Sequence, residues 1–267
     1  MNTILTSPCF VIHLPKNKER LSVYTKLVDA GYQQIHLFEG VNGTLTTSVR
    51  IALARLRQPT IDPTISTGAL GCLLSHLTLL QKIVDLQIPI ATIFEDDILF
   101  HPQWKELSEH YLSITPSDYE VIFIGNQLDS CRQGILGPEI TKEPLYCTHA
   151  YIVTLEGARK LLHSLLHWNY KNTPYQGLTI VDVMIKHLQM KSSPENPPFQ
   201  WYAWNGTHYP CDYNKMPISL EQCRNTGIVF QDTRLPTTVQ GTYTFQENNA
   251  YTFSESKRPL RNLLRFS

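Results

Sequence analysis

Hydrophobic and polar positions along roughly the first 190 residues alternate between two patterns. Short apolar runs of strand length are followed by longer segments whose apolar residues recur at helical spacing. The runs predict strands at 10–14, 34–38, 88–94, 119–124 and 147–154, and helices at 17–31, 49–56, 68–86, 103–113, 156–166 and 180–188. This alternation predicts an α/β fold in which helices cover a largely parallel sheet.

The pattern changes after Ser192, where prolines and aromatic residues replace the periodic segments. The residues that stand out in this irregular C-terminal segment are Trp201, Tyr202, Trp204, His208 and Tyr209. Aromatic side chains offer flat apolar area with a polar edge, which suits sugar rings, but they also form hydrophobic lids over sheets. We therefore divide the chain into residues 1–192 and an irregular segment, 193–267, that packs on the same domain.

Composition limits the class of protein. The chain has 267 residues, 42% hydrophobic and 17% charged, which suits one large α/β domain with or without an appendage. A formal net charge of zero argues against a general nucleic-acid binder. The N-terminus lacks a secretory pattern and no uninterrupted apolar run is long enough for a bilayer, so we expect folding in the cytosol. The six cysteines include no CxxC pair, which disfavours a zinc site and a disulfide framework.

The predicted strand at 88–94 leads directly into Glu95, Asp96 and Asp97. Ligands of open α/β sheets collect at the carboxyl ends of such strands. Adjacent carboxylates repel one another, so a hard divalent metal ion, or the hydroxyls of a sugar or ribose, would suit this position. In an extended segment Glu95 and Asp97 would share one side while Asp96 faces elsewhere. The alternative is a solvated acidic loop.

The predicted helix at 68–86 has two different faces. Its apolar face should pack on the sheet through Leu70, Leu73, Leu74, Leu77 and Val84. The opposite face is small and polar, and consists of Gly68, Gly71, Cys72, Ser75 and His76. Glycines cost a helix about 1 kcal/mol each, so something must approach the backbone closely. It is either another segment of the chain or a bound nucleotide or diphosphate, with Ser75 and His76 supplying hydrogen bonds.

Four pieces of sequence together resemble glycosyltransferase family 25, the lipooligosaccharide and collagen galactosyltransferase group. They are FVIHL at 10–14 followed by Arg20, GALGCLLSH at 68–76, IFEDD at 93–97, and HAY at 149–151 followed by Gly157 and Ala158. The resemblance covers most of residues 10–188. It departs from the family at His13, where Asn is more usual, and the tail after Ser192 has no match.

The resemblance implies a GT-A type fold, with a Rossmann-like sheet flanked by helices and a nucleotide-sugar donor at the carboxyl ends of its strands. It implies metal-dependent inverting transfer of a sugar, galactose, from a UDP-sugar to a glycan or glycolipid acceptor with Mn²⁺ or Mg²⁺. Donor binding then falls to His13, Arg20, Gly71, Ser75, His76, Glu95 and Asp96, and metal binding to Asp97, Glu95 and His208. Residues 193–267 would complete the acceptor side.

An inverting transferase needs one base to take the proton of the acceptor hydroxyl. Our candidate is Asp182, at the start of the last predicted helix, with Asp129 and Asp212 as competitors. Asp182 is equally typical of a carboxylate that favours a helix N-terminus. His149 could orient a loop or a phosphate, or be a core histidine. For His208 the alternative is a surface or lid histidine.

The C-terminus alternates basic and apolar residues: Lys257, Arg258, Arg261 and Arg265 interleave with Leu260, Leu263, Leu264 and Phe266. This pattern suits contact with the inner face of a membrane that holds a lipid-linked acceptor, and equally a docked helix or a disordered tail. Two other functions share the same site. They are a catalytically silent nucleotide-sugar or glycan binding protein, and a hydrolase of nucleotide-sugars.

Overall fold

The computed structural model describes residues 3–127, 139–169, 171, 173–191, 198–205, 225–232, 242–245 and 251–254. The helices are α1 Thr3–Thr6, α2 Ser22–Ala30, α3 Thr46–Arg55, α4 Thr67–Asp85, α5 Trp104–Ile114, α6 Leu155–Leu166 and α7 Val181–Lys191, with a 3₁₀ turn η1 Lys18–Leu21. The strands are β1 Pro8–His13, β2 Gln34–Glu39, β3 Ile90–Glu95, β4 Ile98–Phe100, β5 Val121–Gln127, β6 Glu139–Thr141, β7 Tyr146–Thr154, β8 Trp201–Asn205, β9 Asn225–Gly227, β10 Val229–Gln231, β11 Thr242–Phe245 and β12 Tyr251–Ser254.

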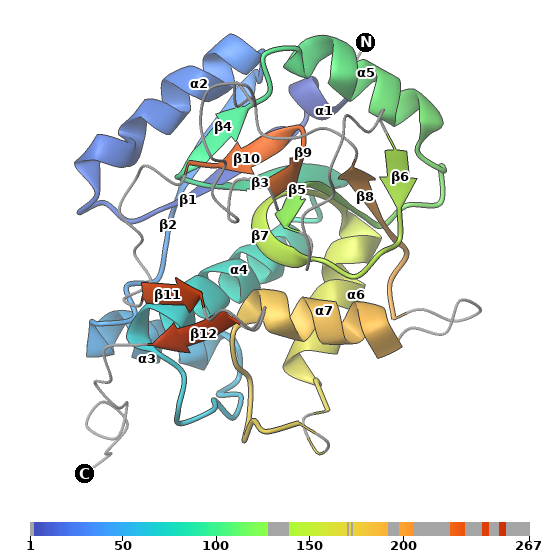
Figure 1. Cartoon of the computed structure of the whole chain (residues 1–267). Helices are drawn as coiled ribbons and strands as arrows, with labels where there is room; N and C mark the ends of the chain where they lie inside the picture. Colours follow the sequence, from blue (N-terminus) through green and yellow to red (C-terminus); the bar gives the residue numbers. More distant parts are fainter. Residues whose placement is uncertain are drawn as a thin grey trace.

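The centre of the fold is a sheet with the strand order β2-β1-β3-β7-β5-β8-β6, to which β9 adds beside β5 (Figure 1). Strands β1, β2 and β3 are mutually parallel, as predicted. The sheet as a whole is mixed, because β7 lies between β3 and β5 and runs antiparallel to both. The prediction of an α/β sheet flanked by helices is confirmed, and its parallel part is confined mainly to the first three strands.

Helices cover both faces of this sheet (Figure 1). One apolar cluster joins α3, α4, α6 and α7 to the sheet, and a second joins α2 and α5 to the opposite face. Helix α4 is long and apolar enough to cross a membrane by length and composition alone, yet 67% of its most apolar 18-residue window is buried inside the fold. Its apolar character is accounted for by its place in the core.

Helix α2 differs from the prediction in the face that it buries. The sequence predicts that Asn17 caps this helix and that Leu21, Tyr24, Leu27 and Val28 form its apolar side. The buried residues are instead Val23, Leu27 and Ala30. Leu21, Tyr24 and Val28 are 41%, 47% and 50% exposed. Asn17 makes no side-chain capping bond, and the chain passes through the 3₁₀ turn η1 before α2 begins at Ser22. The α-helix therefore starts later than the sequence suggested, and a different set of residues faces the core. Its end at Gly31, with φ of 98°, is as predicted.

Strand β8 settles the alternative left open for the C-terminal aromatic residues that the structure describes. It pairs with β5 in parallel, and Trp201, Tyr202 and Trp204 are buried. These side chains therefore belong to the core of the sheet and not to a binding surface. His208, Tyr209 and the basic residues near the C-terminus lie outside the described residues.

The connections around β1 determine where a ligand can bind. The chain leaves β1 through α2 on one face to reach β2, and returns through α3 and α4 on the other face to reach β3 on the opposite side of β1. In open α/β sheets a crevice forms outside the carboxyl ends of the strands where the winding reverses in this way. The topology therefore places a binding crevice beside the ends of β1 and β3.

Candidate functional site

A pocket lies at the carboxyl ends of β1, β2 and β3. Its walls are the loop after β1, the loop 40–44 after β2 and the first turns of α4, and Glu95 and Asp96 line it where β3 ends. Of the residues predicted to bind a donor, those that line it are Arg20, Gly71, Ser75, His76, Glu95 and Asp96.

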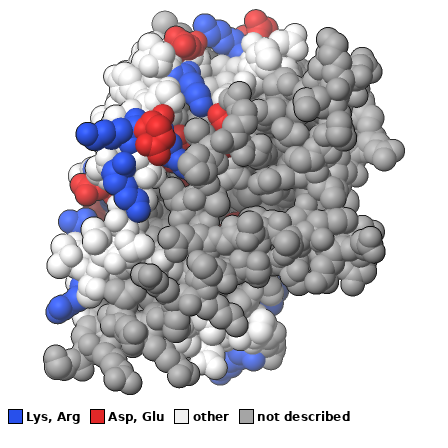
Figure 2. Space-filling model, turned by 60° about the vertical axis from the view of Figure 1, so that its left-hand side comes forward, with Lys and Arg blue, Asp and Glu red and all other residues white. Residues whose placement is uncertain are grey.

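On the described part of the face shown in Figure 2, basic and acidic side chains lie next to one another, in keeping with the formal net charge of zero.

A buried network joins the first loop of the chain to the acidic residues. Arg20 donates from Nη1 to Asp96 Oδ1 at 2.6 Å and to Asp97 Oδ2 at 3.2 Å. His13 Nδ1 lies 2.8 Å from Asp96 Oδ2. Burial alone would lower the pKa of Arg20, but its hydrogen bond to Asp96 and the charges of Asp97 and Asp96 raise it. Arg20 is therefore a permanent counter-charge for two carboxylates.

Asp96 does not face away from Asp97, as simple alternation predicted. Strand β3 ends at Glu95, and Asp96 and Asp97 form a turn before β4 begins at Ile98. Side chains in a turn do not alternate between two faces as they do in an extended strand. The turn thus brings Asp96 and Asp97 together on Arg20 and leaves Glu95 with different partners.

Asp97 has a carboxylate oxygen that fits a cation. Its Oδ2 accepts from Arg20 and, at 3.4 Å, from Gln231 Nε2, whereas its buried Oδ1 has no hydrogen-bond partner in the part of the chain that the structure describes. Burial raises the pKa of Asp97 to about 7, with the charge of Glu95 adding to the effect and that of Arg20 opposing it. A buried carboxylate oxygen that lacks a partner among the described residues, beside two other carboxylates, suits a hard divalent ion such as Mn²⁺ or Mg²⁺.

Glu95 is held by a helix and a strand that lie far from it in the sequence. His76 Nε2 lies 3.3 Å from Glu95 Oε1, and Thr148 Oγ1 donates to the same oxygen at 3.1 Å. Burial alone would raise the pKa of Glu95, but the hydrogen bond and charge of His76, with the charge of His149 and the bond from Thr148, lower it. Glu95 is therefore an ionised carboxylate at the edge of the pocket.

The small face of α4 packs against the loop after β2. A Cβ at Gly71 would lie 2.6 Å from the carbonyl oxygen of Val41, so no larger residue fits. Ser75 Oγ accepts from the backbone amide of Val41 at 2.7 Å and donates to the carbonyl oxygen of Gly71 at 2.6 Å. Gly71 is therefore required by the close approach of another segment of the chain, which is one of our two alternatives. Ser75 fixes this segment, which forms a wall of the pocket.

Asp182 lies at the start of α7 and is half-buried. Its Oδ1 accepts from the backbone amide of Val183 at 2.7 Å, as a carboxylate at a helix N-terminus does. Burial raises its pKa, and the charge of Glu95 adds to this even though hydrogen bonds from the Val183 and Cys147 backbone oppose it. The competing residues Asp129 and Asp212, and the predicted metal ligand His208, lie outside the described residues.

Three polar partners of the site were not anticipated from the sequence. Thr148 bonds Glu95, Gln231 bonds Asp97, and the hydroxyl of Tyr151 lies 3.1 Å from His76 Nδ1. Only the strand pairing could have revealed them: β7 places Ala150 opposite Phe94, and β10 places Gln231 opposite Ile98. His149 lies in the core, with Nε2 donating to the carbonyl oxygen of Val229 at 3.1 Å.

The family model described as glycosyltransferase family 25 (LPS biosynthesis protein) matches residues 6–133. Residues 6–133 are therefore similar to glycosyltransferase family 25. This region contains the first three pieces of the resemblance, including all three acidic residues, while the fourth piece at 149–158 lies beyond it.

Two relatives are each similar to more than half of this chain. Procollagen galactosyltransferase 1-B of Xenopus laevis is 27% identical over 174 residues, which cover 58% of this chain and 28% of that protein. A bovine protein named probable inactive glycosyltransferase 25 family member 3 is 25% identical over 168 residues, again 58% of this chain and 28% of the relative. The chain thus spans little more than a quarter of the length of these relatives.

Among solved structures, apo mouse xyloside xylosyltransferase 1 overlaps 86% of this chain and 85% of its own with a TM-score of 0.42 and 11% identity. That overlap is too weak to add to the argument.

Proposed function

We propose that this chain is a metal-dependent inverting glycosyltransferase that moves a sugar, galactose, from a UDP-sugar to a glycan or glycolipid acceptor. The observation that carries the proposal is the pocket at the reversal point of the sheet, which Glu95 and Asp96 line, inside the region that is similar to family 25. The name of the Xenopus relative, a procollagen galactosyltransferase, supports galactose as the sugar.

The walls of the pocket suit a nucleoside diphosphate. Thr67 and Gly68, at the N-terminus of the 19-residue helix α4, line it, and a helix N-terminus favours anions. Glu95 and Asp96 offer carboxylate oxygens to the hydroxyls of a ribose or a donor sugar. Ser75 acts indirectly, by fixing the loop beside the diphosphate through Val41.

Asp97 and Glu95 would hold the metal ion, with His208 as a further ligand. A bound Mn²⁺ or Mg²⁺ neutralises the charge that develops on the leaving diphosphate. Arg20 compensates part of the charge of Asp96 and Asp97 and so keeps these carboxylates together in the absence of substrate. Asp97 is the best candidate ligand, because its buried Oδ1 has no hydrogen-bond partner among the described residues.

Asp182 would accept the proton of the acceptor hydroxyl. Its raised pKa makes its carboxylate a stronger base than an ordinary aspartate, which favours proton transfer. We place the acceptor beside α7, with residues after 192 completing that side. A lipid-linked acceptor would set the reaction at the inner face of a membrane, with residues 257–265 in contact with it.

The test is Mn²⁺-dependent release of UDP from a panel of UDP-sugars, with and without a mixture of glycan acceptors. Asp97→Asn should abolish turnover, as should chelation, and Asp118→Asn is the matched control, because Asp118 is an exposed carboxylate that bonds Tyr202 and Gln200. UDP binding without turnover of any donor would overturn the proposal in favour of a binding protein, the reading that the name of the bovine relative suggests. UDP release at the same rate with and without acceptors would favour a hydrolase.

A further inference from the structure

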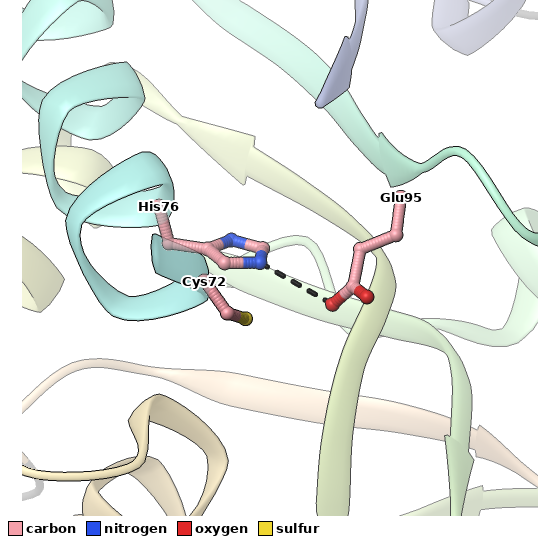
Figure 3. A group of neighbouring side chains, drawn as sticks. All are labelled: Cys72, His76 and Glu95. Carbon is pink, nitrogen blue, oxygen red and sulfur yellow. Dashed lines mark hydrogen bonds and ion pairs between the residues drawn. The ribbon is translucent and has the colours of Figure 1, made fainter. Parts of the chain in front are cut away.

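Beside the acidic turn, Cys72, His76 and Glu95 form a cluster with a different set of donor atoms. Figure 3 shows Cys72 and His76 leaving α4 one helical turn apart and pointing toward Glu95 at the end of β3. The thiol, imidazole and carboxylate donor atoms all lie within 4.8 Å of one another. All three residues line the pocket, so an ion can reach them from solvent.

The spacing of the cluster agrees with that of ligands around one ion. His76 Nε2 and Glu95 Oε1 are 3.3 Å apart. Two ligands of a tetrahedral zinc ion, each bound at about 2.0 Å, are separated by about 3.3 Å. The Cys72 sulfur lies within 4.8 Å of both other donor atoms, and Cys72 leaves α4 on the same side as His76, so its side chain is placed to turn toward the same ion.

His76 is already oriented as a ligand. Its Nδ1 lies 3.1 Å from the hydroxyl of Tyr151, and the two rings stack with their centroids 5.8 Å apart. Without a metal ion, Nε2–H donates to the ionised Glu95 and Nδ1 accepts from the Tyr151 hydroxyl. When an ion replaces that proton, the ring carries its proton on Nδ1, the Tyr151 hydroxyl turns to accept from it, and the Nε2 electron pair is directed at the ion. Metal-binding histidines are usually fixed by such a bond from the second ring nitrogen.

The surroundings favour a cation at the thiol. The negative charges of Glu95, Asp182 and Asp97 all act on Cys72. The buried cation Arg20 is already paired with Asp96 and Asp97. A divalent ion would relieve the excess of negative charge and hold the thiol as thiolate.

We propose that Cys72, His76 and Glu95 bind one Zn²⁺ ion, with the fourth position open to the pocket. Sulfur, nitrogen and oxygen together suit zinc, whereas Mn²⁺ and Mg²⁺ prefer oxygen alone. Binding forms bonds from zinc to Sγ, Nε2 and a Glu95 oxygen, and the Cys72 proton passes to solvent. The site is distinct from the metal position proposed at Asp97, although both use Glu95.

Zinc binding does not depend on the transferase activity, but its consequence rests on the proposed function. When Zn²⁺ binds Glu95, this carboxylate is no longer available to the sugar donor or to the Mn²⁺ or Mg²⁺ ion. Zn²⁺ therefore inhibits the transfer reaction, and Cys72→Ser raises the Zn²⁺ concentration that gives half inhibition by at least tenfold.

The direct test uses the full-length chain stripped of metal and titrated with Co²⁺, which takes zinc sites and reports thiolate ligands through a sulfur-to-cobalt absorption band. The native chain should develop the band to saturation at one equivalent, and Zn²⁺ should displace it. Cys72→Ser should lose the band and bind Zn²⁺ at least tenfold more weakly. Cys147→Ser is the matched control, since Cys147 is a half-buried cysteine outside the cluster. This variant should keep both the absorption band and the native affinity for Zn²⁺.

A native chain without the band, or a band that survives in Cys72→Ser, would overturn the proposal whatever the transferase assay shows. A second measurement needs no variant and so does not depend on whether Cys72→Ser folds. Zn²⁺ should protect Cys72 of the native chain from alkylation by iodoacetamide, as mapped by peptide mass, and should leave Cys147 unchanged. Equal labelling of Cys72 with and without Zn²⁺ would contradict the site.

Discussion

The guanidinium of Arg20 lies 2.6 Å from Asp96, 76 residues further along the chain, and both side chains are buried. The pair fixes the loop after β1 against the turn after β3. The pocket opens at the carboxyl ends of these two strands. The candidate site and the stability of the fold therefore share this contact.

Removing Arg20 should destabilise the chain strongly. Arg20→Ala leaves Asp96 and Asp97 buried without their counter-charge, a situation that costs about 3–5 kcal/mol. Arg159→Ala is the control, because Arg159 forms an exposed pair with Glu156 of a kind worth about 0–1 kcal/mol. Urea unfolding measures both. Equal losses of unfolding free energy would show that the buried network contributes nothing beyond a surface ion pair.

Gly71→Ala should reverse the usual effect of this substitution. Alanine in place of glycine inside a helix normally stabilises by about 0.5–1 kcal/mol. Here the new methyl group would lie 2.6 Å from the carbonyl oxygen of Val41, so the loop 40–44 must move. We expect a lower melting temperature and weaker UDP binding by calorimetry. A higher melting temperature would mean that the loop yields freely.

Ser75→Ala should cost about 1–3 kcal/mol, because the backbone amide of Val41 loses its acceptor in a buried position. Thr78→Val on the same helix removes a hydroxyl that, among the described residues, donates to the Leu74 and Ser75 carbonyl oxygens, and it keeps the shape of the side chain. It should cost less than Ser75→Ala. Chemical denaturation of the two variants side by side decides whether Ser75 holds the loop.

The rate should depend on the ionisation of Asp182. A base acts when deprotonated, so kcat/KM rises as pH increases through its pKa, and burial places that pKa above the ordinary value of an aspartate. Asp182→Asn should lower the rate by roughly 10²–10⁴-fold and remove this acidic limb. A pH–rate profile of both proteins measures the effect. A variant that keeps the native profile would assign the base to another residue, such as Asp129 or Asp212.

The sequence predicted best those elements whose pattern is local. The helix expected at 68–86 is α4 at 67–85, and the strand expected at 88–94 is β3 at 90–95, because a long periodic run and a short apolar run are each legible without knowing their neighbours. The buried face of α2 was wrong because a 3₁₀ turn shifts its start.

What the sequence could not supply are contacts that depend on strand register. Thr148 and Gln231 bond residues 53 and 134 positions away, and no spacing in the chain relates them. The cluster at Cys72 was missed for the same reason. Cys72 and His76 have a recognisable four-residue spacing, but Glu95 joins them only after α4 and β3 are packed together.

Strand β3 is clamped on both sides, by β1 in parallel from Cys9↔Thr92 to Ile12↔Glu95 and by β7 antiparallel from Ile90↔Thr154 to Phe94↔Ala150. A strand paired in this way cannot slip by one residue without turning its buried side chains to the opposite face. The acidic turn that follows is therefore preorganised before any ligand arrives. Little of the free energy of binding is lost in ordering it, and the entropic cost of association falls on the ligand and on the surrounding loops.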